Sequence, residues 1–115
     1  TEDRSHLLKD GDHRLLKEFL HKRLGGATAV ICYNDDIAYH LIQTLLEAGH
    51  PVPQEVAVVS FDNSYLSQLG PVPVTSLRHR SHMGRVAAEQ ILALLDGGTA
   101  RSKFLEWELI VRSSG

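Results

Sequence analysis

The feature that most constrains the fold is a set of three short apolar runs, each of which ends in polar side chains. The runs cover residues 28–33, 56–61 and 74–77, and the polar groups that follow them are Asn34-Asp35, Asp62-Asn63 and Arg78-His79. A continuous apolar run bounded by turn residues is typical of a strand that is covered on both faces of a parallel sheet. We therefore predict three buried strands at these positions.

Helical patterns surround these runs. Apolar residues recur at helical spacing over residues 13–24, 36–48 and 81–95, with Asp12 and Ser81 as candidate N-caps of the first and last. Residues 105–111 alternate between apolar and charged side chains, as a half-exposed strand does. The alternation predicts an α/β fold with a mostly parallel sheet and right-handed crossovers. Because the pattern begins on a helix and holds few strands, we expect the chain to be part of a larger unit.

Composition narrows the classes of function. The chain has 115 residues and a net charge of −2, so its charge gives no sign of nucleic-acid binding. Its apolar runs are far shorter than the roughly 20 residues that cross a bilayer, and residues 1–4 do not begin a secretory signal. The single cysteine, Cys32, lies in an apolar run, so we expect a buried, unreactive thiol, in keeping with a reducing cytoplasm.

The polar ends of the three runs form a candidate ligand site. If the strands are parallel neighbours, these ends meet at one edge of the sheet, where α/β proteins bind ligands. Asn34, Asp62 and His79 would supply an amide, a carboxylate and an imidazole, a set that suits a neutral polyhydroxyl ligand. A purely structural interpretation, which the spacing alone favours, is also open: Asn34 or Asp35 caps a helix and Asp62-Asn63 forms an Asx-turn.

Other chemistries fit the sequence less well. Asp35, Asp36 and Asp62 resemble the carboxylate cluster of a phosphoryl receiver, but such a pocket also needs a lysine at a later strand end, and none stands there. His79 and His82 are three residues apart without a cysteine partner or a His-Glu-x-x-His pattern. The sequence contains no nucleophile elbow, P-loop or Gly-x-Gly-x-x-Gly motif. We predict no enzyme, no metal site and no cofactor.

Blocks of residues over most of the chain resemble the effector-binding domain of the lactose-repressor/galactose-repressor family. They begin with Ala-Val-Ile-Cys-Tyr-Asn-Asp-Asp-Ile-Ala (29–38) and Leu-Leu-Glu-Ala-Gly-His-Pro-Val-Pro-Gln-Glu-Val-Ala-Val-Val-Ser-Phe-Asp-Asn (45–63). Pro-Val-Thr-Ser-Leu-Arg-His (73–79), Met-Gly-Arg-Val-Ala-Ala-Glu (83–89) and Trp-Glu-Leu-Ile-Val-Arg-Ser-Ser (107–114) follow in order. Within that family the blocks are most similar to the arabinose-repressor branch, which carries an N-terminal winged-helix DNA-binding domain. The resemblance implies a partial periplasmic-binding-protein-like fold with a flavodoxin-like lobe.

The resemblance also implies roles for single residues. Asn34 and Asp62 match positions that hydrogen-bond a sugar or a purine in many members, and His79 matches a polar position in the cleft. Leu77, Arg78 and Arg80 match a hinge between two lobes. Residues 1–77 would then belong to the C-terminal lobe, and residues 78–115 would hold the hinge crossing and the helix and strand of the partner lobe.

Two residues depart from the family pattern. The family usually has glycine where Ser60 stands and often aspartate where Asn63 stands. Ser60 would crowd a close approach of the backbone. Asn63 removes one carboxylate, which bears on the choice of effector or only on the local turn.

The family implies a function for the whole protein. We expect the effector-binding part of a cytoplasmic transcriptional repressor, with L-arabinose or a related sugar as effector and with DNA bound only through an N-terminal domain outside this sequence. Val86, Ile91, Leu94 and Trp107 would lack an apolar partner in this chain, so we expect a homodimer. The alternatives are a periplasmic sugar-binding transport protein and a small α/β enzyme or phosphoryl receiver.

Overall fold

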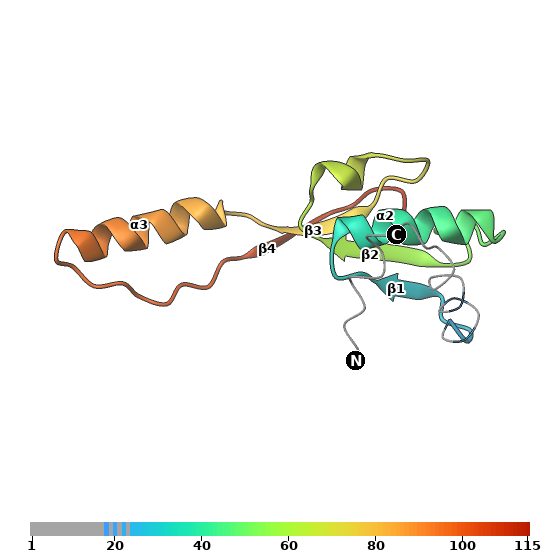
Figure 1. Ribbon diagram of the computed structural model, residues 1–115, viewed down its shortest axis with the longest axis horizontal. Coiled ribbons are helices and arrows are strands. Elements are labelled where there is room, and N and C mark those ends of the chain that lie inside the picture. The colour runs from blue at the N-terminus through green and yellow to red at the C-terminus, as the bar shows by residue number, and fades with distance from the viewer. Residues whose placement is uncertain (1–17, 19, 21, 23) are drawn as a thin grey trace.

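The structure is a computed structural model that describes residues 18, 20, 22 and 24–115 and shows a four-stranded sheet with an outlying helix (Figure 1). Its elements, in chain order, are β1 (Ala29–Ile31), α2 (Asp35–Glu47), β2 (Ala57–Phe61), the short 3₁₀ helix η2 (Tyr65–Gln68), β3 (Thr75–His79), α3 (Met83–Leu95) and β4 (Trp107–Ile110).

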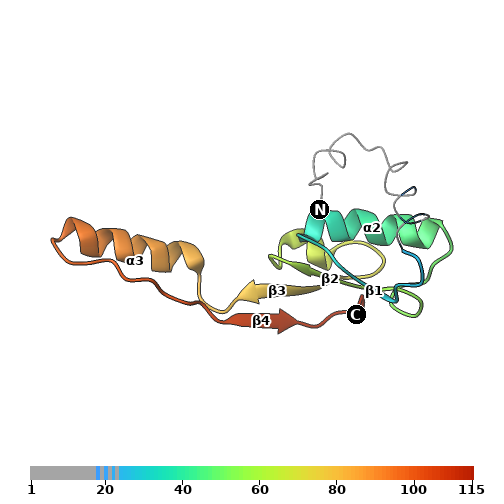
Figure 2. The same ribbon diagram turned by 90° about the horizontal axis from the view of Figure 1, so that it is seen from below.

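The sheet is mostly parallel, as predicted. Its strand order is β1-β2-β3-β4, with β1, β2 and β3 parallel and β4 antiparallel to β3. Because the first three strands run in one direction, their carboxyl ends lie at the same edge of the sheet. Figure 2 shows that this edge faces the side from which α3 projects.

The core lies between the sheet and α2. Ala38, Leu41, Ile42 and Leu45 of α2 are at most 2% exposed and share one buried cluster with Val58 of β2. This stripe follows the 3.6-residue period that the sequence shows over the helix. The helix therefore holds the sheet from one face and fixes where its carboxyl edge lies.

The bounds of the elements differ from the predicted ones at several ends. β3 continues to His79, so Arg78 and His79 lie inside the strand and not after it, because β4 pairs with them. The predicted cap Ser81 was wrong: His82 is the N-cap of α3, without a side-chain hydrogen bond. The helix predicted over residues 13–24, with its cap Asp12, falls mostly outside the described residues.

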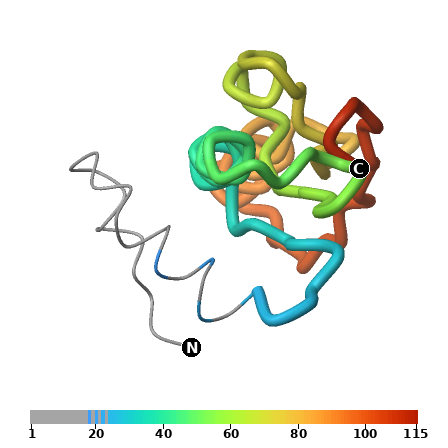
Figure 3. The backbone as a smooth tube through the Cα atoms, turned by 90° about the vertical axis from the view of Figure 1, so that its right-hand side faces the viewer, coloured from blue at the N-terminus to red at the C-terminus, as the bar shows by residue number. Residues whose placement is uncertain are grey.

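Helix α3 stands apart from the rest of the molecule. The molecule measures 58 × 27 × 23 Å, and α3 occupies one end of the long axis (Figure 1). None of the residues of α3 is buried, and Ile91 and Leu94 are 57% and 52% exposed. Viewed along the long axis, α3 lies behind α2 and the sheet (Figure 3). Two chain crossings, one out of β3 and one into β4, connect it to the sheet.

The last residues of the chain return to the sheet. The backbone N–H of Val58 donates to Ser114 O at 2.7 Å, and Ser114 N donates to Pro73 O at 3.1 Å. Ser114 is fully buried. The chain beyond β4 thus packs on the body that holds β1 and β2, although the predicted boundary assigns residues 78–115 to the hinge and the partner lobe. The division into lobes stays a prediction.

Candidate functional site

The three predicted ligand residues lie at the carboxyl edge of neighbouring parallel strands. Asn34 follows β1, Asp62 directly follows β2, and His79 is the last residue of β3. The ladder joins these strands in order: Ile31 pairs with Val59, and Phe61 pairs with Leu77. Asp62 N donates to Leu77 O at 2.9 Å, which ties the Asp62 corner to β3. Topology therefore brings the three positions to one edge of the sheet.

Asn34 caps helix α2. Its Oδ1 accepts a hydrogen bond from Ile37 N at 2.9 Å, and its backbone is extended, with φ −151° and ψ 173°. An asparagine oxygen that satisfies one of the free amides of the first turn is a common helix start. The cap uses only the oxygen, so the side-chain amide group keeps two N–H donors. The structural interpretation thus holds for the oxygen of Asn34, and the NH₂ group is what Asn34 can offer to a ligand.

Asp62 has an unusual backbone and an exposed side chain. Its φ is 96°, in the region that favours glycine, and Asn63 after it has a φ of 49°. Among the described residues, no group donates a hydrogen bond to the Asp62 carboxylate. A non-glycine residue in this conformation persists only where its surroundings hold it, and such residues cluster at functional sites.

His79 lies in an aromatic cluster on the sheet. Its ring stacks on Trp107, the residue opposite it on β4, with a centroid distance of 3.8 Å and an interplanar angle of 32°. Phe61 meets Trp107 edge to face at 5.6 Å. His79 Nδ1 is buried and has no hydrogen-bond partner within the described part of the chain. A buried ring nitrogen without a partner is costly, so His79 is held here by stacking and keeps unused hydrogen-bonding capacity.

The predicted hinge residues lie in β3 and directly after it, where the chain leaves the sheet toward α3. Arg78 pairs with Glu108 at 2.9 Å, and Arg80 pairs with Glu106 at 3.3 Å. Both pairs join β3 or its continuation to the strand that returns from α3. Leu77, the remaining predicted hinge residue, pairs with Leu109 across the same ladder. These exposed pairs contribute little stability each, and the hinge role stays a prediction.

Asp35, which the sequence analysis considered as a helix cap and as a receiver carboxylate, is buried and connects the elements behind this edge. Asp35 is 1% exposed. Its Oδ1 accepts hydrogen bonds from Ser60 Oγ and, at 2.7 Å, from Ser76 Oγ, and its Oδ2 accepts one from Ser64 N at 2.5 Å. The sequence places Asp35 directly after the first apolar run but does not show that Ser60 and Ser76 are its partners. Ser60, where the resemblance implies glycine, uses its hydroxyl to bind Asp35.

This network also bears on the phosphoryl-receiver alternative. A receiver needs its acidic residues free to hold a metal ion, whereas both oxygens of Asp35 accept hydrogen bonds from the protein. Among residues that the structure describes, no three metal-ligating side chains gather. None of the helices in that part of the chain is long and apolar enough to cross a membrane.

Cys32 is buried, as predicted. Its side chain is 4% exposed, and burial raises the pKa of the thiol from 9.0 to about 12. A thiol with so high a pKa carries almost no thiolate near neutral pH, and the thiolate is the reactive form. The thiol therefore contributes packing below the edge and no reactivity.

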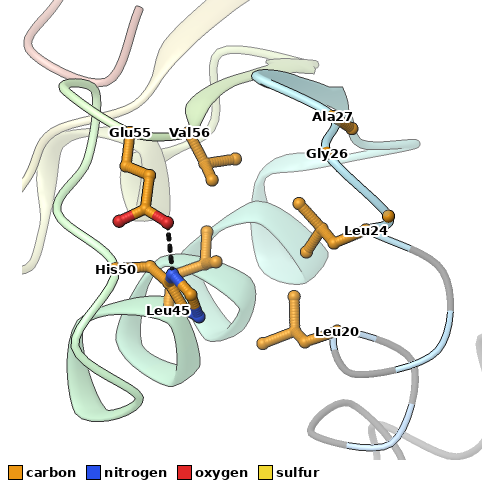
Figure 4. A pocket seen from close by; sticks show the side chains of 9 residues that line it. Leu20, Leu24, Gly26, Ala27, Leu45, His50, Glu55 and Val56 are labelled. Atoms are coloured by element: carbon orange, nitrogen blue, oxygen red, sulfur yellow. Dashed lines mark hydrogen bonds and ion pairs between the residues drawn. The ribbon is translucent and has the colours of Figure 1, made fainter.

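A pocket of about 260 Å³ lies at the opposite end of the sheet (Figure 4). Ala27, which precedes β1, and Val56, which precedes β2, line it, together with Leu20, Leu24 and Leu45. His50 Nδ1 lies 2.7 Å from Glu55 Oε1 beside it. The amino ends of the strands form this pocket, so it is separate from the edge that carries Asn34, Asp62 and His79.

Comparisons with known proteins agree with the fold and with the blocks of sequence. Residues 3–115 match the family model described as a periplasmic binding protein-like domain. The arabinose metabolism transcriptional repressor of Halalkalibacterium halodurans is 34% identical over 85 residues, which make up 73% of this chain and 22% of that protein. The chain therefore spans about a fifth of the length of this relative.

Solved structures of transcriptional regulators share the fold. The transcriptional regulator CelR in complex with cellobiose is 30% identical with a TM-score of 0.78, over 92% of this chain and 33% of that one. A LacI family transcriptional regulator from an Arthrobacter species, in complex with lactose, is 26% identical with a TM-score of 0.73, over 84% of this chain and 38% of that one. The match over nearly the whole sequence, together with these relatives, shows that the chain belongs to the family of periplasmic binding protein-like domains.

Proposed function

We propose that this chain is part of the effector-binding domain of a bacterial transcriptional repressor and that the effector is a sugar. The observation that carries the proposal is Asp62: an exposed carboxylate without a described partner, held at φ 96° at the carboxyl edge of three parallel strands. Carboxylates accept hydrogen bonds from neighbouring hydroxyl groups, and α/β folds bind ligands at this edge. Relatives of the same fold were solved with cellobiose and lactose.

Each predicted ligand residue has a definite part in this proposal. Asp62 accepts hydrogen bonds from sugar hydroxyls, and the free NH₂ group of Asn34 donates to the sugar because its oxygen is used by the cap. His79 donates from the crossing strand, beside Trp107. No bond of the sugar is made or broken, so the protein is a sensor and not an enzyme. L-arabinose is the first candidate because the arabinose metabolism transcriptional repressor of Halalkalibacterium halodurans is 34% identical to this chain.

The response to the sugar is a movement of two lobes. The effector binds between the lobes, and closure about Leu77, Arg78 and Arg80 changes the distance between two DNA-binding domains of a homodimer. DNA is bound in the cytoplasm by an N-terminal domain outside this sequence. The regulators among the relatives favour this function over a periplasmic transport protein of the same fold.

Isothermal titration of the full-length protein with L-arabinose, cellobiose, lactose and D-glucose tests the proposal. We expect one of these sugars to bind, and Asp62→Asn to weaken that binding about tenfold, because a sugar hydroxyl loses its charged acceptor. The exposed Asp36→Asn, on the helix behind the edge, is the matched control and leaves the affinity unchanged. Absence of binding to all four sugars, or equal affinity in wild type and Asp62→Asn, overturns the proposal.

A further inference from the structure

The corner that carries Asp62 contains two successive residues with positive φ, Asp62 at 96° and Asn63 at 49°. Residues with a side chain rarely adopt the first of these values, so the corner needs contacts that hold it. Hydrogen bonds to Asn63 supply these contacts from two directions: from Ser76 inside the sheet and from Arg112 near the end of the chain.

The inner contact runs through Ser76. Its Oγ accepts a hydrogen bond from Asn63 N at 3.0 Å and donates one to Asp35 Oδ1 at 2.7 Å. Ser76 is fully buried in β3, and Asp35 is itself held by Ser60 and by Ser64 N. The residues on both sides of the Asp62 corner are therefore fixed to one buried carboxylate.

The outer contact comes from Arg112, which follows β4. Its Nη2 donates to Asn63 Oδ1 at 2.5 Å, its Nη1 donates to Val74 O at 2.8 Å, and its backbone N donates to Thr75 Oγ1 at 2.9 Å. The planar guanidinium bridges the Asn63 side chain and the start of β3 with a fixed geometry. The Asn63 side chain thus serves as an acceptor for Arg112.

We infer that Ser76 and Arg112 are positioning residues for the effector: through Asn63 they hold the Asp62 backbone in the conformation that presents its carboxylate to the sugar. The inference rests on the proposed function of Asp62. Neither residue touches the sugar. Both raise affinity by removing the need to order the corner on binding, which is the effect of preorganisation.

A double-mutant cycle in the full-length protein tests the inference, with whichever of L-arabinose, cellobiose, lactose or D-glucose binds the wild type. We expect Ser76→Ala and Arg112→Lys each to weaken that binding about tenfold when Asp62 is present and by less than about twofold in the Asp62→Asn background. Arg112→Lys keeps the positive charge and removes the forked guanidinium group. Because Arg112 is only partly buried, we expect this variant to fold even if Ser76→Ala does not.

Ser114→Ala is the matched control. Ser114 is as buried as Ser76, but its hydroxyl binds Val58 O and Thr75 N and makes no hydrogen bond to Asn63 or Asp35. We expect it to lower the melting temperature without a change in sugar affinity. The positioning role alone is overturned if sugar binding depends on Asp62 but not on Ser76 or Arg112. It is also overturned if Ser76→Ala and Arg112→Lys lose the same affinity in the wild-type and the Asp62→Asn background. Absence of sugar binding, or binding that Asp62→Asn leaves unchanged, overturns the proposed function and this inference with it.

Discussion

Ser76 and Asp35, which are 41 positions apart in the sequence, are joined by a buried hydrogen bond of 2.7 Å from Ser76 Oγ to Asp35 Oδ1. The bond connects the first turn of α2 to Ser76 near the start of β3. Because Ser60 of β2 donates to the same oxygen, one carboxylate fixes the helix and two strands relative to one another.

Replacement of Asp35 tests the structural weight of this carboxylate. Asp35→Ala leaves the hydroxyls of Ser60 and Ser76 and the amide of Ser64 without their acceptor in a buried environment, so we expect a loss of about 3 kcal/mol in the free energy of unfolding. Urea denaturation measures it. Asp36→Ala, at the exposed next position, changes it by no more than about 0.5 kcal/mol. Similar losses in both variants would contradict the role of the network.

Asp62→Gly separates stability from function. Glycine adopts a φ of 96° without strain, so we expect this variant to be more stable than the wild type by up to about 1 kcal/mol and to bind the sugar more weakly. Asp62→Ala, which cannot relieve the strain, is the control and is expected to be less stable than Asp62→Gly. Thermal denaturation and sugar titration of the full-length protein measure the two effects. A loss of stability in Asp62→Gly would show that the carboxylate has a structural role.

Variants of Asn34 separate the helix cap from ligand binding. Asn34→Asp keeps an oxygen that accepts from Ile37 N and loses the NH₂ donor, so we expect nearly unchanged stability and weaker sugar binding. Asn34→Ala removes both groups and is expected to cost about 1 kcal/mol of stability as well. Comparison of melting temperature with sugar affinity decides between the two roles. If Asn34→Asp binds sugar as the wild type does, Asn34 is a cap alone.

The buried thiol of Cys32 predicts slow modification and a loss of stability at high pH. Burial raises the pKa of the thiol from 9.0 to about 12, so at pH 8 the folded chain is expected to react with a thiol reagent about 1,000-fold more slowly than the chain in denaturant. The raised pKa means that this contribution to stability is complete below pH 9 and is lost as the pH rises toward 12. Cys32→Ala is the control, because without the thiol it does not show this part of the loss of stability at alkaline pH. Equal reaction rates in folded and denatured chain would contradict the burial.

The order and type of the elements could be predicted from hydrophobic periodicity. The helix over residues 36–48 and the runs at 56–61 and 74–77 lie close to α2, β2 and β3. The predicted burial of the first strand was wrong: the residues of β1 are exposed or half-buried, with Ile31 74% exposed. The end of β3 could not be predicted, since Arg78 and His79 are polar and become strand residues only through pairing with β4. That pairing depends on a segment almost 30 positions later in the chain.

The candidate site was only partly accessible from the sequence. The positions of Asn34, Asp62 and His79 follow from the rule that parallel strands place their carboxyl ends together. The roles of Asp35 and Arg112 could not be predicted, because their partners come from other elements up to 49 positions away. The positive φ of Asp62 is likewise set by tertiary contacts and has no signature in a single sequence.

The exposed apolar surface of α3 and β4 predicts self-association of the 115-residue chain. Ile91, Leu94 and Trp107 are more than half exposed, at 57%, 52% and 51%, and the net charge of −2 gives little repulsion between copies. We expect a dimer or larger species in light scattering. Ile91→Glu is expected to shift the chain toward the monomer because a charge enters the apolar contact. Glu89→Lys, a charge change at another exposed position of the same helix, is the control and leaves the chain associated. A monomeric wild-type chain at high micromolar concentration would contradict the prediction, and association that survives Ile91→Glu would place the contact elsewhere on the surface.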